Sequence, residues 1–586
     1  MSTIRAGNIA TPLAAAGEAP VHVHKGLNDG LTNYGDKAFS RYLRQSFAKS
    51  MGYSDEELSR PVIGIANSAS GYNNCHRHFP ELMEALKRGV LSAGGLPMDF
   101  PTISLGEPFL SPTSMKFRNL MSMDVEEMIT AQPMDAVVLV GGCDKTVPAQ
   151  LMGALSAGRP AIQLVGGPMM TGNYRGERLG ACTDCRRYWG KHRAGEVSTK
   201  QIAEIEGNLA TTAGTCAVMG TASTMACIVE ALGMMLPATA AIPAVHANRL
   251  RAAEATGRQA VWLARQGLKP DHIVTPNSIQ NALRVLLAIS GSTNALIHLT
   301  AIAGRLGIAV TPHMLNALAD STPVLVDLKP TGAFYMEDLH AAGGVPAILR
   351  QLKDLLHLDC MTVTGKTLGE VMEASADDWF DPAVIRPRNE PLRKDGGLIG
   401  LFGTLAPNGA LIKRAAADER LFEHTGRAVV FDSLEDMAAR LDSETLDVEP
   451  EDILVLRNAG PVAAAMPEAG YIPIPAKLAR RGVKDMLRIS DARMSGTGYG
   501  TIVLHISPEA ALHGPLALVL NGDQIRLSLS QRRIDLLVDE AELARRRTTL
   551  PPIPALPARG YGRLYQQHIL QAEHGCDFDF LRHVAT

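Results

Sequence analysis

The stretch MDAVVLVGGCDKTVPAQ, residues 134–150, decides the fold class. After Asp135 it contains the apolar run Ala136–Val140, which is typical of a strand buried on both faces of a parallel sheet. Two glycines then indicate a turn, and the pattern after them predicts a helix. The turn places a thiol, a carboxylate and an amine side by side at Cys143, Asp144 and Lys145. These three groups need a chemical explanation.

The same pattern recurs on both sides of this stretch. Apolar runs at 61–68 and 161–168 end in glycine or small polar residues, and helical patterns such as Arg77–Ala93 and Met121–Ala131 lie between the runs. This alternation predicts an α/β domain with a parallel sheet. Ligands bind at the carboxyl ends of the strands in such sheets, and Cys143 lies at such an end.

The pattern changes after about residue 390. Short apolar runs broken by Gly, Pro, Asn and Asp lie at 398–413, 427–433, 452–458, 485–507 and 523–539. Their spacing favours a second, smaller domain that is a β-barrel or sandwich.

The expected organisation has three parts. A flexible N-terminal tail is predicted for residues 1–27, the α/β domain for 28–385 and the barrel domain for 390–586, with the polar loop 377–397 as the boundary. The proline-rich stretch 546–564 is expected to form an extended strap on the surface.

Composition argues against several functions. The net charge of −3 gives no reason to expect nucleic acid or an anionic membrane as a partner. The most apolar segment, Ala217–Leu236, contains Glu230 and ends before Pro237, so it is interpreted as a buried helix and not as a membrane span. The N-terminal residues lack a sustained apolar core, so we predict no signal peptide and a cytoplasmic location.

Three of the eight cysteines lie in loops of small residues at the ends of predicted elements: Cys75, Cys143 and Cys216. Fe–S clusters are held by thiolates, and three protein thiolates leave one iron position open for a substrate. The alternative is three unrelated buried cysteines, because their spacing matches no short ligand motif.

A C-x-x-C pair at Cys182 and Cys185, with His192 nearby, suggests a zinc or redox site elsewhere in the chain. A structural zinc site would need a second cysteine pair or two spaced histidines, and there is no second C-x-x-C. We interpret the pair as incidental.

Oxygen ligands from separate loops suit Mg²⁺. Asp144 follows the strand at 134–140, Glu107 lies in PTISLGEPFL at the end of another predicted strand, and Glu468 lies in NAGPVAAAMPEAG, a loop of the second domain. Lys145 could join them only after CO₂ converts its amine to an anionic carbamate. The alternative for both glutamates is a solvated loop acid.

A serine also lies at the end of a predicted strand, at Ser495 in ISDARMSGTGYGT. The G-x-S-x-G elbow of hydrolases is absent, so a hydrolase triad is not indicated. Ordinary turn chemistry is the alternative.

Seven fragments together resemble the family that groups dihydroxy-acid dehydratase with 6-phosphogluconate dehydratase and the sugar-acid dehydratases. They are NNCHRHFPEL, GGCDKTVPAQLMGA, GGPMMTG, GTCAVMGTASTMACIVEALGM, GSTNALIHL, GTLAPNGALIK and SDARMSGTGYGT. They run in family order from about residue 28 to 570. GLTNYGD, SLGEPF and DARMSGT resemble the L-arabinonate branch most.

The resemblance implies a role for each candidate. It makes Cys75, Cys143 and Cys216 the ligands of a [2Fe–2S] cluster, with [4Fe–4S] as the alternative. It makes Glu107, Asp144, carbamylated Lys145 and Glu468 the ligands of Mg²⁺. It makes Ser495 the base, with Thr497 as the second candidate. The family fold is an α/β domain followed by a β-barrel domain.

The implied reaction is loss of water from a 2,3-dihydroxycarboxylate, giving a 2-keto acid. An aldonate such as L-arabinonate is the expected substrate, and a homodimer or homotetramer is expected. The alternatives are dihydroxy-acid dehydratase acting on 2,3-dihydroxyisovalerate, an enzyme that accepts both substrates, and a non-catalytic Fe–S protein.

The chain departs from the family pattern before Glu468. The family has a glycine-rich loop there, whereas this chain has three alanines at 463–465. Alanine adopts positive φ less readily than glycine, so the loop is expected to run differently.

Overall fold

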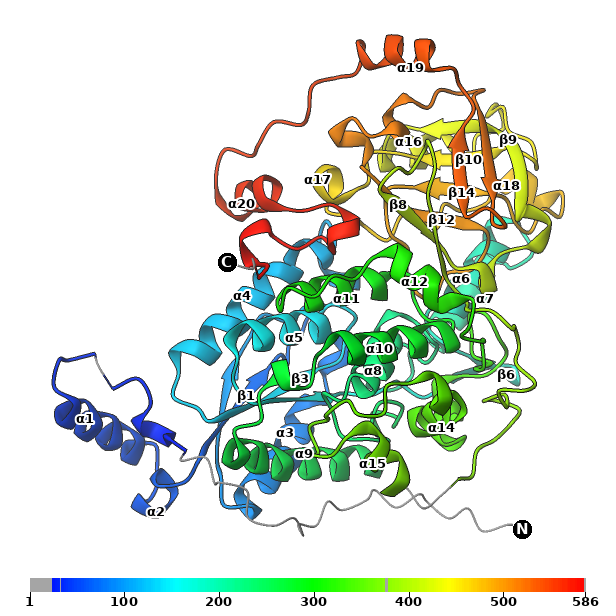
Figure 1. The fold of residues 1–586 in the computed structure, drawn as a ribbon. Coiled ribbons are helices and arrows are strands. Elements are labelled where there is room, and N and C mark those ends of the chain that lie inside the picture. The colour runs from blue at the N-terminus through cyan, green and yellow to red at the C-terminus, as the bar shows by residue number, and fades with distance from the viewer. Residues whose placement is uncertain (1–23, 32, 375–377, 584–586) are drawn as a thin grey trace.

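A computed structural model describes residues 24–31, 33–374 and 378–583. Most of the predicted tail at 1–27 therefore lies outside the described residues. In the described part, an α/β half is followed by a barrel (Figure 1).

The first half is built on a four-stranded parallel sheet with the order β2-β1-β3-β4. Its strands are β1 (Val62–Asn67), β2 (Leu96–Pro101), β3 (Ala136–Gly141) and β4 (Ala161–Val165). The parallel α/β prediction is confirmed. Strand β2 is the strand predicted before Glu107, although Pro97 and Pro101 interrupt its apolar pattern. An edge strand tolerates proline, and β2 is an edge strand of this sheet.

Helices cover both faces of this sheet (Figure 1). On one side lie α3 (Phe79–Ser92) and α9 (Ala247–Gln266), and on the other lie α4 (Met115–Ala131) and α5 (Thr146–Ala157). The α3 and α9 backbones approach very closely: a Cβ atom at Gly89 would meet the Glu254 carbonyl oxygen at 2.0 Å. A larger residue at Gly89 would force the two helices apart.

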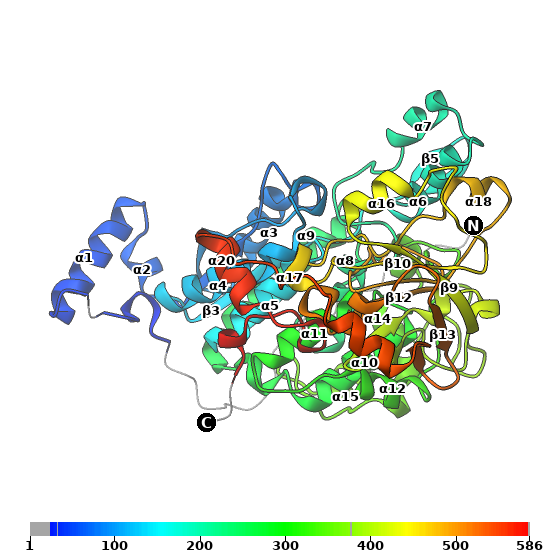
Figure 2. The ribbon, with the colours of Figure 1, turned by 90° about the horizontal axis from the view of Figure 1, so that it is seen from above.

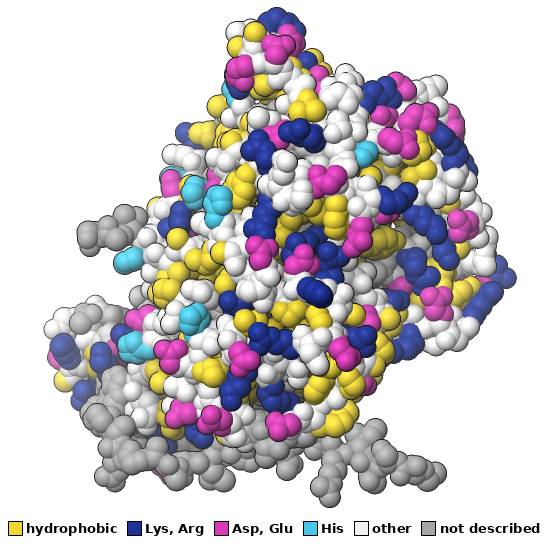
Figure 3. Space-filling model, turned by 45° about the vertical axis from the view of Figure 1, so that its right-hand side comes forward, with side chains coloured by type: hydrophobic (Ala, Val, Ile, Leu, Met, Phe, Trp, Pro, Cys, Tyr) yellow, Lys and Arg dark blue, Asp and Glu magenta, His cyan; other side chains and the backbone are white. Residues whose placement is uncertain are grey.

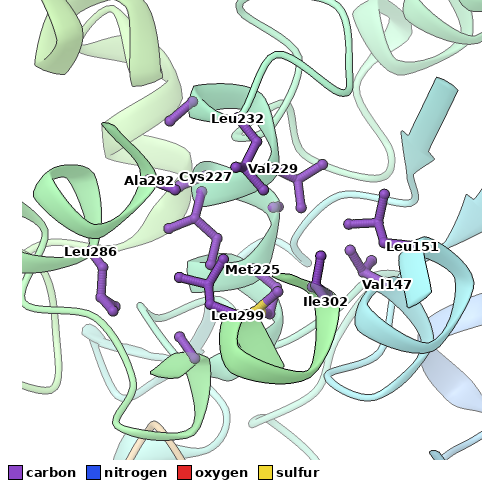
Figure 4. Close-up of a cluster of buried hydrophobic side chains, with 14 of the residues drawn as sticks. Val147, Leu151, Met225, Cys227, Val229, Leu232, Ala282, Leu286, Leu299 and Ile302 are labelled. Atoms are coloured by element: carbon purple, nitrogen blue, oxygen red, sulfur yellow. The ribbon is translucent and has the colours of Figure 1, made fainter. Parts of the chain in front are cut away.

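A second layer of helices packs on α5. Its central helix α8 (Thr221–Ala231) is buried along its whole length, which confirms the interpretation of Ala217–Leu236 as a buried segment. Side chains of α5, α8, α10 (Pro276–Ala288) and α11 (Asn294–Gly304) meet in one apolar cluster (Figure 4). No helix among the described residues is both long and apolar enough to cross a membrane.

The second half is an eight-stranded sheet with the order β14-β13-β9-β10-β11-β12-β8-β7. Its strands are β7 (Ile399–Leu401), β8 (Gly409–Ile412), β9 (Glu423–Phe431), β10 (Ile453–Leu456), β11 (Arg488–Ser490), β12 (Ile502–Ser507), β13 (Gln524–Ser528) and β14 (Arg533–Leu536). Phe402, directly after β7, donates to the Arg532 carbonyl oxygen at 2.9 Å and accepts from the Ile534 amide at 2.8 Å. These bonds join the two edge strands, and the predicted barrel is confirmed.

The end of the chain returns to the first half. After α19 (Glu540–Arg547) an exposed run leads to α20 (Gly560–His568). Beyond α20, Phe578 packs with Met115 and Ile297 in a buried cluster. Arg305 and Asp577 form an ion pair at 2.7 Å in which both side chains are fully buried. The last described residues therefore pack on α4 and α11.

The remaining regular elements are short or peripheral. They are α1 (Lys37–Ser50), α2 (Asp55–Leu58), β5 (Gly172–Tyr174), β6 (Glu177–Leu179), α6 (Thr183–Arg193), α7 (Thr199–Glu206), α12 (Pro312–Ala319), α13 (Met336–Ala341), α14 (Gly344–Leu352), α15 (Leu368–Ala374), α16 (Leu434–Arg440), α17 (Pro461–Ala464) and α18 (Ala476–Arg480). Helices α1 and α2 project from the body (Figures 1 and 2). On the face shown in Figure 3, acidic and basic side chains are interspersed.

Candidate active site

The candidate residues of the first half follow three neighbouring strands. Cys75 lies in the turn Asn74–His76 after β1, Glu107 begins the turn Glu107–Phe109 after β2, and Cys143 lies two residues after the end of β3. Because the strands are parallel, their carboxyl ends lie at one edge of the sheet. The three residues therefore lie at the edge where ligands bind in such sheets.

Three carboxylates meet at this edge. One oxygen each of Glu107, Asp144 and Glu468 lies within 4.8 Å of the other two. The fully buried Lys145 ammonium is in contact with Asp144 and lies 3.7 Å from Glu107 and 3.9 Å from Glu468. All four residues that sequence analysis assigned to one metal are thus brought together from both halves of the chain.

Arg493 holds two of these carboxylates. Its Nη1 donates to Glu468 Oε1 at 2.5 Å, and its Nη2 lies 3.1 Å from both oxygens of Glu107. Burial disfavours the charged form of Glu107, but Arg493 and Lys145 outweigh burial and hold the pKa of Glu107 well below its ordinary value. Thr113 Oγ1 also donates to Glu107, at 2.9 Å. Glu107 is therefore an anionic oxygen donor at neutral pH.

The alanine-rich loop before Glu468 adopts the backbone conformation that glycine favours. Ala465 and Met466 both have φ of 56°, in the left-handed region that side chains disfavour by about 1–2 kcal/mol per residue. The Met466 carbonyl oxygen accepts a hydrogen bond from Arg493 Nε at 2.8 Å. The loop was expected to run differently because it lacks glycine, yet it delivers Glu468 to the other two carboxylates.

The three candidate thiols converge beside the carboxylates. The neighbouring Cys75 thiol, together with burial, holds the pKa of the Cys143 thiol well above its ordinary value. Cys216 is near enough to both thiols to interact with them electrostatically. Cys143 Sγ also lies 3.7 Å from Asp144 Oδ1, so the cluster of thiols is directly adjacent to the cluster of carboxylates.

The C-x-x-C pair, which was expected to lie away from the three candidate thiols, lies beside one of them. Cys182 Sγ lies 3.8 Å from Cys216 Sγ, and the Cys185 thiol lies close enough to Cys182 to affect its pKa. The interpretation of the pair as a separate feature was wrong, because the fold brings the start of α6 against the loop of Cys216. The site thus contains five cysteines.

Ser495 and Thr497 lie in the loop after β11, on the same loop as Arg493. Ser495 Oγ is 2.9 Å from Thr497 Oγ1. Asn294 Nδ2 donates to the Met494 carbonyl oxygen at 2.8 Å, which ties this loop to α11. The loop that carries Arg493, Ser495 and Thr497 is therefore held against the first half of the chain.

Sequence reasoning missed several polar residues that support the site. Arg493 lies inside the quoted fragment SDARMSGTGYGT but was not singled out. His76 Nε2 accepts from the Cys143 amide at 3.0 Å, and Thr113 and Ser114 donate to Glu107. The only sequence signal for them was their place beside the fragments that carry the resemblance.

The fold and this site define a dehydratase, a member of the hydro-lyase class. The chain belongs to the dihydroxy-acid/6-phosphogluconate dehydratase family: the N-terminal model of that family matches residues 60–371 and its C-terminal model matches residues 383–576. The resemblance stated from the sequence is confirmed.

Three relatives illustrate the range of the family. The L-arabonate dehydratase of Azospirillum brasilense is 46% identical over 559 residues, covering 94% of this chain and 96% of the relative. The 6-deoxy-6-sulfo-D-gluconate dehydratase of Pseudomonas putida is 44% identical, covering 90% of this chain and 92% of the relative. The dihydroxy-acid dehydratase of Carboxydothermus hydrogenoformans is 38% identical, covering 92% and 98%.

Proposed function

We propose that the protein removes water from an aldonate, a 2,3-dihydroxycarboxylate such as L-arabinonate, and releases a 2-keto-3-deoxy acid. The observation that carries the proposal is the contact between Cys143 and Asp144, where the cluster of thiols meets the cluster of carboxylates. A thiol set suits an Fe–S cluster and a carboxylate set suits Mg²⁺. Adjacent residues would therefore hold the two metals side by side, where one substrate could touch both.

The residues fit the two metal groups. Cys75, Cys143 and Cys216 are proposed to hold a [2Fe–2S] cluster, with [4Fe–4S] as the alternative. Mg²⁺ would take oxygen from Glu107, Asp144 and Glu468, whose donor atoms already lie within 4.8 Å of one another. Lys145 would supply a fourth oxygen as a carbamate. A carbamate also replaces a buried ammonium by an anion that the metal neutralises.

When bound, the two metals would act as Lewis acids toward the substrate carboxylate, its 2-hydroxyl and its departing 3-hydroxyl. The chain's own residues move the proton. Ser495 Oγ is the proposed acceptor of the C2 proton. Thr497 Oγ1, 2.9 Å away, can donate a hydrogen bond to the Ser495 oxygen and stabilise its anionic form. Arg493, two residues earlier on the same loop, adds positive charge.

The substrate proposal rests on the relatives. The two whose names contain a sugar acid are 46% and 44% identical to this chain, and the dihydroxy-acid dehydratase is 38% identical. A site built for hydroxyl groups rejects substrates that lack them, because its buried polar groups are left unpaired. The alternatives are 2,3-dihydroxyisovalerate as substrate and a promiscuous site.

A kcat/KM panel over pentonates, hexonates, D-glycerate and 2,3-dihydroxyisovalerate tests the substrate, with 2-keto acid formation as the readout. An aldonate should lead the panel. If 2,3-dihydroxyisovalerate led by tenfold, about 1.4 kcal/mol of transition-state preference, the branched-chain alternative would replace the proposal. Equal rates would indicate that the site reads only the carboxylate and the two reacting hydroxyls.

The proposal includes an assembly and a location. The enzyme is proposed to act as a homodimer or homotetramer in the cytoplasm, without nucleic-acid or membrane partners. The family resemblance supports the assembly, and the net charge of −3 gives no reason to expect a polyanionic partner. Light scattering of the purified protein would test the oligomer.

A further inference from the structure

We propose that Cys182 is a fourth thiolate ligand of the cluster in the substrate-free enzyme, on the iron atom that Cys216 binds. The inference rests on the proposed function for the presence of the cluster. It adds a ligand that the three-cysteine assignment does not contain.

The first argument is the distance between the two sulfur atoms. Thiolates bind a tetrahedral metal ion at about 2.3 Å, so two thiolates on one ion lie about 3.8 Å apart. Cys182 Sγ and Cys216 Sγ are 3.8 Å apart. The pair therefore already has the separation required for two ligands of one iron atom.

The second argument is that both neighbours of Cys182 are tied to the site. The Ala181 carbonyl oxygen accepts a hydrogen bond from the Ala217 amide at 3.1 Å, directly beside Cys216. Thr183 Oγ1 donates to the Thr497 carbonyl oxygen at 3.1 Å. The position of Cys182 is thus fixed by the loop of a proposed cluster ligand and by the loop of the proposed base.

The third argument is the environment of the thiol. Cys182 and Cys185 pack against the buried side chains of Met169, Ala181 and Ala217. Ala217 directly follows Cys216 in the chain, so Cys182 lies in apolar surroundings beside a proposed cluster ligand.

Cys185 is the neighbouring cysteine against which the role of Cys182 can be compared. It lies one turn further along α6 and contacts Cys182, whereas the only thiol recorded within hydrogen-bonding distance of Cys216 among the described residues is Cys182. Cys185 is therefore assigned as a neighbour of the fourth ligand and not as a ligand.

The consequence concerns access to the iron. Three thiolates leave one iron position open, and a fourth closes it. Substrate would then bind by exchanging with the Cys182 thiolate, a ligand exchange in which nothing is oxidised or reduced. The reactive iron would be shielded from oxygen until substrate arrives.

The test compares the wild type with Cys182→Ser and Cys185→Ser, all purified anaerobically with their clusters. Mössbauer and resonance Raman spectra of the substrate-free wild type should show every iron with full sulfur coordination. Cys182→Ser should keep its iron and sulfide but show one iron with an oxygen ligand. Cys185→Ser should match the wild type. Identical spectra for wild type and Cys182→Ser would overturn the inference.

A second measurement needs no variant. Alkylation of the native holoenzyme with iodoacetamide, read by mass spectrometry, should leave Cys182 protected and should modify it faster when an aldonate is added. Modification of Cys182 at the same rate with and without aldonate would overturn the inference, as would a disulfide at Cys182 in the anaerobic protein. Absence of iron and sulfide from the wild type would overturn the proposed function itself, which separates the two failures.

Discussion

Arg493 and Glu107 are 386 residues apart in the chain, yet the Arg493 Nη2 atom lies 3.1 Å from both carboxylate oxygens of Glu107. The same guanidinium binds Glu468. One fully buried cation therefore balances two carboxylates that come from different halves of the protein, and the site depends on it before any metal binds.

Replacing Arg493 by methionine should destabilise the protein by about 3–5 kcal/mol, because removing one partner leaves buried carboxylates uncompensated. Urea unfolding would measure this loss. Arg480→Met is the control: Arg480 pairs with Glu444 at the exposed surface, where such pairs contribute about 0–1 kcal/mol. Equal effects of the two substitutions would contradict the role given to Arg493.

Cys143→Ser should lose cluster iron and the brown colour of the anaerobic protein, since serine cannot supply the thiolate. Cys360→Ser is the matched control, because Cys360 is also buried but contacts Asn281 and no thiol of the site. Iron and sulfide analysis would measure both variants. Full cluster content in Cys143→Ser would remove Cys143 from the ligand set.

Lys145→Arg should be inactive. Arginine keeps the positive charge among the three carboxylates but cannot form a carbamate. Turnover with Mg²⁺, with and without added bicarbonate, is the measurement. Near-normal turnover would remove the modified lysine from the mechanism and leave Lys145 as a counter-ion.

Ser495→Ala should keep fold and cluster but lose proton removal by about 10²–10⁴-fold, the usual effect of a general base. Exchange of the C2 deuteron of a labelled aldonate reports this step directly. If exchange persisted, the role would pass to Thr497, and Thr497→Val would then abolish it.

Lys413→Met should stabilise the protein in a pH-dependent way. Burial lowers the pKa of Lys413 to about 7, and its ammonium has no hydrogen-bond partner among the described residues. The unfolded chain keeps the ordinary value of 10.5. Folding below pH 7 must therefore bury a charge, and this cost declines as the pH rises from 7 toward 10.5.

The stability gain of Lys413→Met should be about 5 kcal/mol below pH 7 and should shrink steadily above it. Urea midpoints at several pH values would show the trend. A gain independent of pH, or a loss of stability at pH 6, would contradict the assignment of a buried unpaired ammonium.

The order of the two domains and the main site residues could be predicted from the sequence. The strand, turn and helix around Cys143 were predictable, because an apolar run that ends in two glycines is typical of a buried strand followed by a tight turn. The position of Cys143 at the sheet edge was predictable, because parallel strands bring their carboxyl ends together. Glu468 and Ser495 were assigned to the same site as Cys143 only through the family resemblance, because no local sequence pattern connects residues so far apart in the chain.

Other features were not predictable for physical reasons. Cys182 reaches Cys216 across 34 residues only because α6 packs against the Cys216 loop, and no spacing rule covers such a contact. The pairing of Arg493 with Glu107 requires the two halves to be docked. The bounds of β2 were not predictable, because Pro97 and Pro101 interrupt its apolar pattern.

The buried pair of Arg305 and Asp577 has a consequence for biosynthesis. Arg305 belongs to the first half of the chain, but Asp577 follows it by 272 residues. A nascent chain can close the parallel sheet and pair Arg305 with Glu126 early, yet the bidentate contact with Asp577 forms only after the whole barrel has been translated. Ribosome-bound intermediates that stop before Asp577 should therefore leave the C-terminal end of α11 uncovered, and truncation before Asp577 should impair the maturation of a region made hundreds of residues earlier.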